Sequence, residues 1–207
     1  MCHADRVNLS LDSVGAVLFD MDGTLIDSHP AVERAWRAVA ARRGLDADAV
    51  LAVCHGVPAE ATLRRLLPEA SDDLIADEVS RHLEQECVDL DGVVALPGAL
   101  DLIAFLDLVG VGWAVVTSAT ARLARARLGA AAITPPVLVT VDEIALGKPA
   151  PDGFLEGARR CGVGIESCLA VEDSAPGLAA ARASGATVIN VGPCGTSLVT
   201  LLDVLRA

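Results

Sequence analysis

The sequence predicts an α/β protein with a doubly wound parallel sheet and a small all-helical segment inserted after the first strand. Three observations predict this architecture. Short apolar runs alternate with amphipathic segments from residue 96 onward, as in strands joined by crossover helices. One more apolar run precedes them at residues 14–19, and the residues between carry only helical periodicity. We therefore expect a core of residues 1–28 and 94–207, with a helical cap at 29–93.

The first strand is the run at 14–19, whose unbroken apolar character is typical of a strand buried on both faces. From Pro30 to Ala40, apolar residues recur every three or four positions, which predicts a helix that ends at Gly44. Residues 47–90 are expected to form three or four further helices, separated at 55–58 and near Pro68.

The remaining elements follow from alternating patterns. The expected strands are residues 112–117, 137–141, 168–171 and 187–191. The expected helices are residues 99–108, 121–128, 151–161, 176–184 and 197–205.

Composition and charge exclude several classes of function. Aromatic residues make up 2% of the 207 residues, which leaves no stacking platform for bases. The formal net charge of −12 would repel a phosphate backbone, so we expect no nucleic-acid partner. A phosphate-handling site would need a divalent cation and a well-placed lysine to counter this charge locally.

The six cysteines include no Cys-x-x-Cys pair, so they predict neither a zinc site nor a disulfide framework. No basic N-terminal segment leads into an apolar stretch, and no apolar run is long enough to span a membrane. The sequence therefore predicts a soluble cytoplasmic protein without a membrane partner, and a monomer is the default expectation.

Two carboxylates, Asp20 and Asp22, directly follow the first strand, and Gly23 and Thr24 then turn the chain. Acidic residues and glycine after a strand can simply form a turn. A calcium loop also begins with Asp-x-Asp, but it requires Gly at its sixth position and Glu at its twelfth, where Leu25 and Ala31 stand.

Polar residues follow four of the predicted strands. Because the carboxyl ends of parallel strands lie at one edge of the sheet, these residues should converge. They are Asp20 and Asp22, Thr117 and Ser118, Lys148, and Glu172 with Asp173.

In chain order, the four segments resemble the four motifs of the haloacid dehalogenase superfamily. They read Asp-Met-Asp-Gly-Thr at 20–24, Val-Val-Thr-Ser at 115–118, Gly-Lys-Pro-Ala-Pro-Asp at 147–152 and Val-Glu-Asp-Ser-Ala-Pro-Gly at 171–177. The helical insert lies between the first and second motifs. In this position it resembles the cap of the subfamily that contains β-phosphoglucomutase and small sugar-phosphate phosphatases.

The resemblance implies a role for each carboxylate. Asp20 would attack phosphorus and form an aspartyl-phosphate, which divides one difficult hydrolysis into two steps. Asp22 would protonate the leaving oxygen and then take a proton from the attacking water. Mg²⁺ held by Asp20, the Asp22 carbonyl and Asp173 would remove the repulsion between nucleophile and phosphate. Glu172 would bind this metal directly or support its ligands.

The resemblance also assigns the substrate contacts. Lys148 would offset charge on the phosphoryl group and on Asp20. Thr117 and Ser118 would donate hydrogen bonds to phosphoryl oxygens, and Thr24 completes the binding residues of the first motif.

The cap loop should read the leaving group of the substrate, and His55-Gly56 looks like the corresponding loop of bacterial sugar and polyol phosphatases. His55 would then contact the substrate; the alternative is that it only occupies a break between two helices. Ala59 stands where β-phosphoglucomutase keeps a basic residue for its second phosphate, which disfavours a mutase, although Arg64 or Arg65 would be substitutes. We predict a Mg²⁺-dependent phosphatase of small sugar or polyol phosphates; a phosphosugar mutase and a catalytically silent phosphometabolite-binding relative are the alternatives.

Overall fold

The structure is a computed structural model that describes residues 11–54, 57–192 and 195–207. The chain divides into two compact units, which we treat separately. The sheet unit comprises the chain up to Asp27 and again from Val94, and the helical unit comprises Ser28–Val93.

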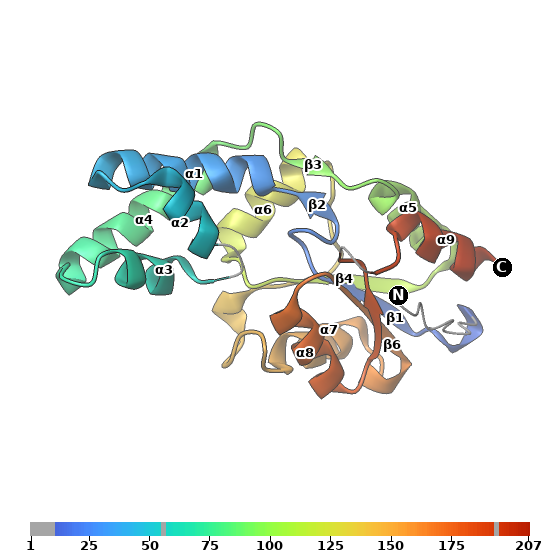
Figure 1. The fold of residues 1–207 in the computed structure, drawn as a ribbon. Helices are drawn as coiled ribbons and strands as arrows, with labels where there is room; N and C mark the ends of the chain where they lie inside the picture. The colour runs from blue at the N-terminus through green and yellow to red at the C-terminus, as the bar shows by residue number, and fades with distance from the viewer. Residues whose placement is uncertain (1–10, 55–56, 193–194) are drawn as a thin grey trace. The chain divides into compact units, whose positions relative to one another are not determined.

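The sheet unit contains five parallel strands in the order β5-β4-β1-β6-β7 (Figure 1). They are β1 (Ala16–Phe19), β4 (Gly112–Val116), β5 (Leu138–Val139), β6 (Cys168–Glu172) and β7 (Thr187–Asn190). From the central β1 the chain winds outward through β4 and β5, then returns to build β6 and β7 on the other side. This confirms the doubly wound parallel sheet that the alternating pattern predicts.

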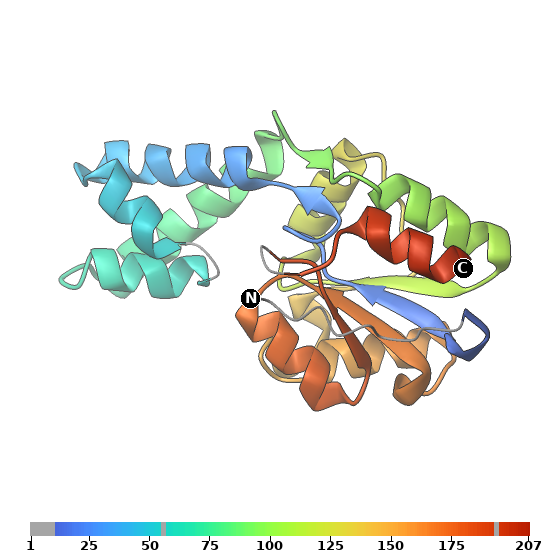
Figure 2. The same ribbon diagram turned by 45° about the vertical axis from the view of Figure 1, so that its right-hand side comes forward.

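Helices cover both faces of the sheet (Figure 2). One face carries α5 (Ala99–Val109), α6 (Ala121–Ala130) and α9 (Leu198–Arg206), and the other carries α7 (Asp152–Cys161) and α8 (Ala175–Ser184). Burial on both sides explains why β1 is an unbroken apolar run: all four of its residues are fully buried. Leu18 and Val116 pack in one core cluster with Phe154 of α7.

The described residues include three short 3₁₀ helices: η1 (Leu11–Ser13) before β1, η2 (Val141–Glu143) and η3 (Ile165–Ser167). The strand predicted at residues 137–141 ends earlier than expected, because Thr140 is the N-cap of η2 and Val141 is its first residue. Glu143 accepts hydrogen bonds from both the amide and the hydroxyl of Thr140, which caps η2 and shortens the strand to Leu138–Val139.

A two-stranded antiparallel pair, which the sequence analysis did not predict, completes the sheet unit. It consists of β2 (Ile26–Asp27) and β3 (Val94–Ala95), with Asp27 opposite Val94. Each strand has only two residues, too few for an alternating pattern to be recognisable in the sequence.

The helical unit contains α1 (His29–Arg43), α2 (Ala47–Cys54), α3 (Ala59–Leu66) and α4 (Asp72–Val88). This confirms the helices predicted for residues 30–90. Gly44 ends α1 in the left-handed conformation, with φ 66°, as its position predicts. The core of the unit is apolar and includes Trp36, Val50, Leu63 and Ile75.

Two acids of α4, Glu78 and Glu86, are buried in the described part of the helical unit. Glu78 accepts from Arg42 at 3.2 Å and Arg43 at 2.5 Å. Burial alone would raise the pKa of Glu78, but these hydrogen bonds outweigh it and hold the pKa below its usual value. Among the described residues, no helix combines the length and apolar content that crossing a membrane requires.

Candidate active site

The strand register places two acids at the same level of the sheet. Phe19 of β1 lies opposite Val171 of β6, so the next residues along, Asp20 and Glu172, lie side by side at the carboxyl ends of the strands. The Asp20 amide donates to the Val171 carbonyl at 2.9 Å, which continues the pairing beyond the strand. The sheet thus positions both acids through its backbone ladder.

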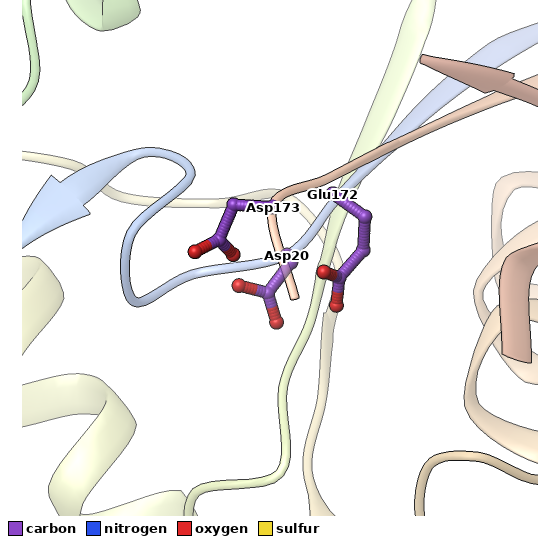
Figure 3. Close-up of side chains that lie close together, drawn as sticks. All are labelled: Asp20, Glu172 and Asp173. Atoms are coloured by element: carbon purple, nitrogen blue, oxygen red, sulfur yellow. The ribbon is translucent and has the colours of Figure 1, made fainter. Parts of the chain in front are cut away.

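Asp20, Glu172 and Asp173 bring their carboxylates together (Figure 3). One oxygen from each lies within 4.8 Å of the others. Burial, strengthened by the neighbouring Glu172 charge, raises the pKa of Asp20 to about 8 despite the opposing effect of Lys148. Burial and Glu172 also raise the pKa of Asp173. The positive charges near the cluster therefore do not fully neutralise its carboxylates.

Lys148 is the cation nearest these acids among the interactions of the described residues. Its ammonium donates to Asp20 Oδ1, to Glu172 Oε1 at 2.6 Å and to the Val116 carbonyl at 3.1 Å. These three contacts use all three donors of the ammonium, so its position is fixed. Burial would lower the pKa of Lys148, but the charges of Asp20 and Glu172 prevail and raise it. Lys148 therefore remains charged and offsets part of the acidic excess.

The remaining excess suits a divalent cation. Asp20, Glu172 and Asp173 offer only carboxylate oxygens, the ligands that hard cations such as Mg²⁺ prefer. The raised pKa values of Asp20 and Asp173 mean that their ionised forms lack stabilisation, which a cation between them would provide. The donor set therefore fits a Mg²⁺ site.

Residues at the start of α8 hold the carboxylate of Glu172 in position. Ser174 donates to Glu172 Oε2 through its amide at 2.8 Å and its hydroxyl at 3.0 Å, and the same hydroxyl accepts from the Gly177 amide. Gly177 lies against the Glu172 carboxylate so closely that a Cβ there would overlap Oε1. Glycine is thus required at this position by the close approach of the helix to Glu172.

Replacing Gly177 by alanine is expected to lower turnover by about 10²-fold, because the added methyl displaces Glu172 and with it Lys148. The same change should lower the free energy of unfolding by about 1–3 kcal/mol through overpacking. Gly129→Ala is a matched control, since a Cβ at this helical position in α6 meets nothing within 4 Å. It should retain activity and gain about 0.4–1 kcal/mol. Equal behaviour of the two variants in kinetics and urea unfolding would contradict this account.

Asp22 lies apart from the carboxylate cluster. Its Oδ2 accepts a hydrogen bond from Nη1 of Arg127, a residue of α6, at 2.9 Å. Its Oδ1 is a buried atom that has no hydrogen-bond partner among the described residues. Gly23, with φ 84°, turns the chain so tightly that a Cβ would overlap the Asp173 carboxylate. Asp22 therefore contacts α6 through Arg127, whereas Asp20 belongs to the carboxylate cluster.

The structure also places the remaining predicted residues. Thr24 is fully buried, and its hydroxyl donates to Asp173 Oδ1 at 3.2 Å, so it holds an acid of the cluster in place. Thr117 is buried beyond the end of β4, where its hydroxyl accepts from the Ala119 amide, and Ser118 is exposed. His55 and Gly56 lie outside the described residues.

Three residues of the site have no role assigned from the sequence: Arg127, Ser174 and Gly177. Ser174 and Gly177 lie in the segment that resembles the fourth motif, but their contacts with Glu172 appear only in the structure, where Ser174 is the N-cap of α8. Arg127 stands in a predicted helix among other arginines, and only its burial sets it apart: its side chain is 5% exposed. A charged residue on the buried stripe of a helix is the signal that could have singled it out.

Comparisons with known proteins support this interpretation. The family described as haloacid dehalogenase-like hydrolase matches residues 14–185. Hexitol phosphatase A of Escherichia coli (strain K12) is 42% identical over 190 residues, covering 91% of this chain and 88% of the relative. Fructose-1-phosphate phosphatase YqaB of the same strain is 32% identical over 187 residues, covering 84% and 95%. The crystal structure of CbbY from Rhodobacter sphaeroides in complex with phosphate matches with a TM-score of 0.73 at 27% identity, covering 86% of each chain.

Proposed function

Because the chain belongs to the haloacid dehalogenase-like hydrolases, we propose that it is a divalent-metal-dependent phosphatase of small sugar or polyol phosphates. The observation that carries this proposal is the cluster of Asp20, Glu172 and Asp173 around the ammonium of Lys148. The curated relatives act on phosphoric monoesters of a hexitol and of fructose, which supports the substrate class.

In the first step, a carboxylate oxygen of Asp20 attacks phosphorus, and the bond from phosphorus to the leaving oxygen breaks. Asp22 gives its proton to that oxygen, and the alcohol departs. In the second step, Asp22 takes a proton from water as the water oxygen attacks the aspartyl-phosphate, which restores Asp20 and releases phosphate. Lys148 contacts the Asp20 oxygen throughout and stabilises the charge that develops there.

Asp20 and Asp173 would hold Mg²⁺ together with the Asp22 carbonyl, with Glu172 beside them. When bound, the ion neutralises the phosphoryl oxygens and lets the anionic nucleophile approach. Thr117 and Ser118 follow β4 at the same edge of the sheet and would donate hydrogen bonds to the phosphoryl oxygens. Helices α1–α4 would serve as the cap, whose loop at His55-Gly56 reads the leaving group.

The proposal is tested by measuring phosphate release from a panel of esters with Mg²⁺ and with EDTA. The panel contains a hexitol phosphate, fructose 1-phosphate, glycerol 1-phosphate and 2-deoxyglucose 6-phosphate. We expect release that requires Mg²⁺ and a preference for one or more of these compounds. Conversion of a hexose 1-phosphate to the 6-phosphate without release would instead establish the mutase. Tight binding of these esters without turnover would identify a catalytically silent relative.

A further inference from the structure

We propose that Arg127 is a positioning residue that anchors the general acid Asp22 and stabilises the charge left on it when its proton departs. This inference rests on the proposed function. The observation behind it is the hydrogen bond from Arg127 Nη1 to Asp22 Oδ2, which joins residues 105 positions apart in the sequence.

The burial of the two side chains shows which one orients the other. Arg127 is 5% exposed and is carried by a ten-residue helix, whereas Asp22 is 32% exposed and lies in a turn. A guanidinium held at this depth needs a carboxylate partner, because an isolated buried charge is strongly unfavourable. α6 is itself held by its N-cap residue, Thr120, whose hydroxyl accepts from the Leu123 amide, and by the burial of Leu123 and Leu128. The helix therefore provides a support from which Arg127 restrains the more exposed Asp22.

The two oxygens of Asp22 have different environments. Oδ2 is held by Arg127, while Oδ1 is buried without a hydrogen-bond partner among the described residues. A buried carboxylate oxygen without a partner is unfavourable unless a ligand supplies one. We assign Oδ1 as the atom that carries the proton for the leaving oxygen, because it is the Asp22 oxygen that accepts no hydrogen bond from the described residues.

The charge of Arg127 suits this task. As the proton of Asp22 moves to the leaving oxygen, a negative charge develops on its carboxyl group. The interaction with the fixed guanidinium strengthens as this charge appears, so Arg127 favours the transition state over the bound substrate. The guanidinium neither gains nor loses a proton in either step.

The leaving group provides a specific test. A polyol alkoxide must be protonated as it departs, but p-nitrophenolate is a weak base that leaves without a proton. We therefore expect Arg127→Met to lower kcat/KM for the best polyol phosphate of the panel by about 10²-fold. For p-nitrophenyl phosphate the loss should stay within about threefold, because that reaction does not need the general acid. kcat/KM is the appropriate quantity, since it reports the steps up to the departure of the alcohol.

Three further variants complete the experiment. Arg127→Lys keeps the positive charge and should recover part of the lost rate. Arg125→Met, an exposed arginine of the same helix, should change neither substrate. Asp22→Asn should show the same selective loss as Arg127→Met, and adding Arg127→Met to it should cause no further loss if Arg127 acts through Asp22.

The outcomes separate this inference from the proposed function. If the wild-type protein hydrolyses no ester of the panel, the proposed function fails. If the wild type is active but Arg127→Met slows both substrates equally, or lowers activity further in the Asp22→Asn background, Arg127 does not act through Asp22. An increase in kcat/KM in Arg127→Met would show that Arg127 restrains Asp22 in an inactive position, which also overturns the inference.

Discussion

Replacing Asp20 by asparagine is expected to reduce phosphate release by at least about 10⁴-fold, because an amide cannot attack phosphorus. The substitution should nevertheless leave the fold intact. Burial raises the pKa of Asp20 to about 8 from an ordinary value of 3.8, so in the absence of metal its ionised form opposes folding between those pH values. Neutral asparagine removes this opposition. In EDTA at pH 8 we expect the Tm to rise by roughly 2–4 °C.

Asp203→Asn, which changes an exposed acid on α9, is the matched control and should alter neither activity nor Tm. Initial rates of phosphate release and a thermal scan in EDTA provide both measurements. A folded variant that stays active would rule out Asp20 as the nucleophile, and a variant with a lowered Tm would contradict the expected gain in stability.

The second large effect concerns Lys148, which is the only lysine in the sequence. Lys148→Met should lower turnover by at least about 10³-fold, because the developing charge on Asp20 and the phosphoryl group loses its fixed counterion. Without metal at pH 8, the free energy of unfolding should fall by about 3–5 kcal/mol, the cost of removing one partner of a buried ion pair.

The pH dependence of this loss follows from the pKa shifts. The acids raise the pKa of Lys148 in the folded protein above 10.5, so its stabilisation is present at neutral pH and lost only above that range. In Lys148→Met the acids repel one another, and this repulsion disappears as they become protonated. The deficit should therefore be largest at pH 8 and shrink toward pH 5 in urea unfolding with EDTA. Arg182→Met, on an exposed position of α8, is the control; a pH-independent deficit would show that packing, not charge, accounts for the effect.

The sequence predicted the parts of the fold that repeated patterns encode. The buried run of β1 and the periodicity of α1 each extend over enough residues to reveal their structure. β2 and β3 were missed because two residues cannot display a period. Thr140 and Glu143 ended β5 through side-chain contacts that depend on the folded loop.

The same distinction applies to the site. Asp20, Lys148, Glu172 and Asp173 follow strands of one parallel sheet, so their convergence could be predicted from the order of the elements, and the structure brings them together. The contact of Arg127 with Asp22 depends on how α6 is rotated about its axis. The order of strands in the sequence does not predict that rotation. The closeness of Gly177 to Glu172 likewise depends on packing distances rather than on sequence spacing.

The β2–β3 pair has a consequence for how this enzyme can diversify. Asp27 and Val94, the last residue before the helical unit and the first residue after it, are partners in one antiparallel ladder, so the two ends of the intervening segment are neighbours. Because its two ends are neighbours, this segment can be lengthened, shortened or exchanged without moving the two points at which it joins the sheet unit. Every described member of the carboxylate cluster lies outside the segment. If the helical segment reads the leaving group, as proposed above, selection for a new substrate can act on this segment while the carboxylate cluster of the sheet is inherited unchanged.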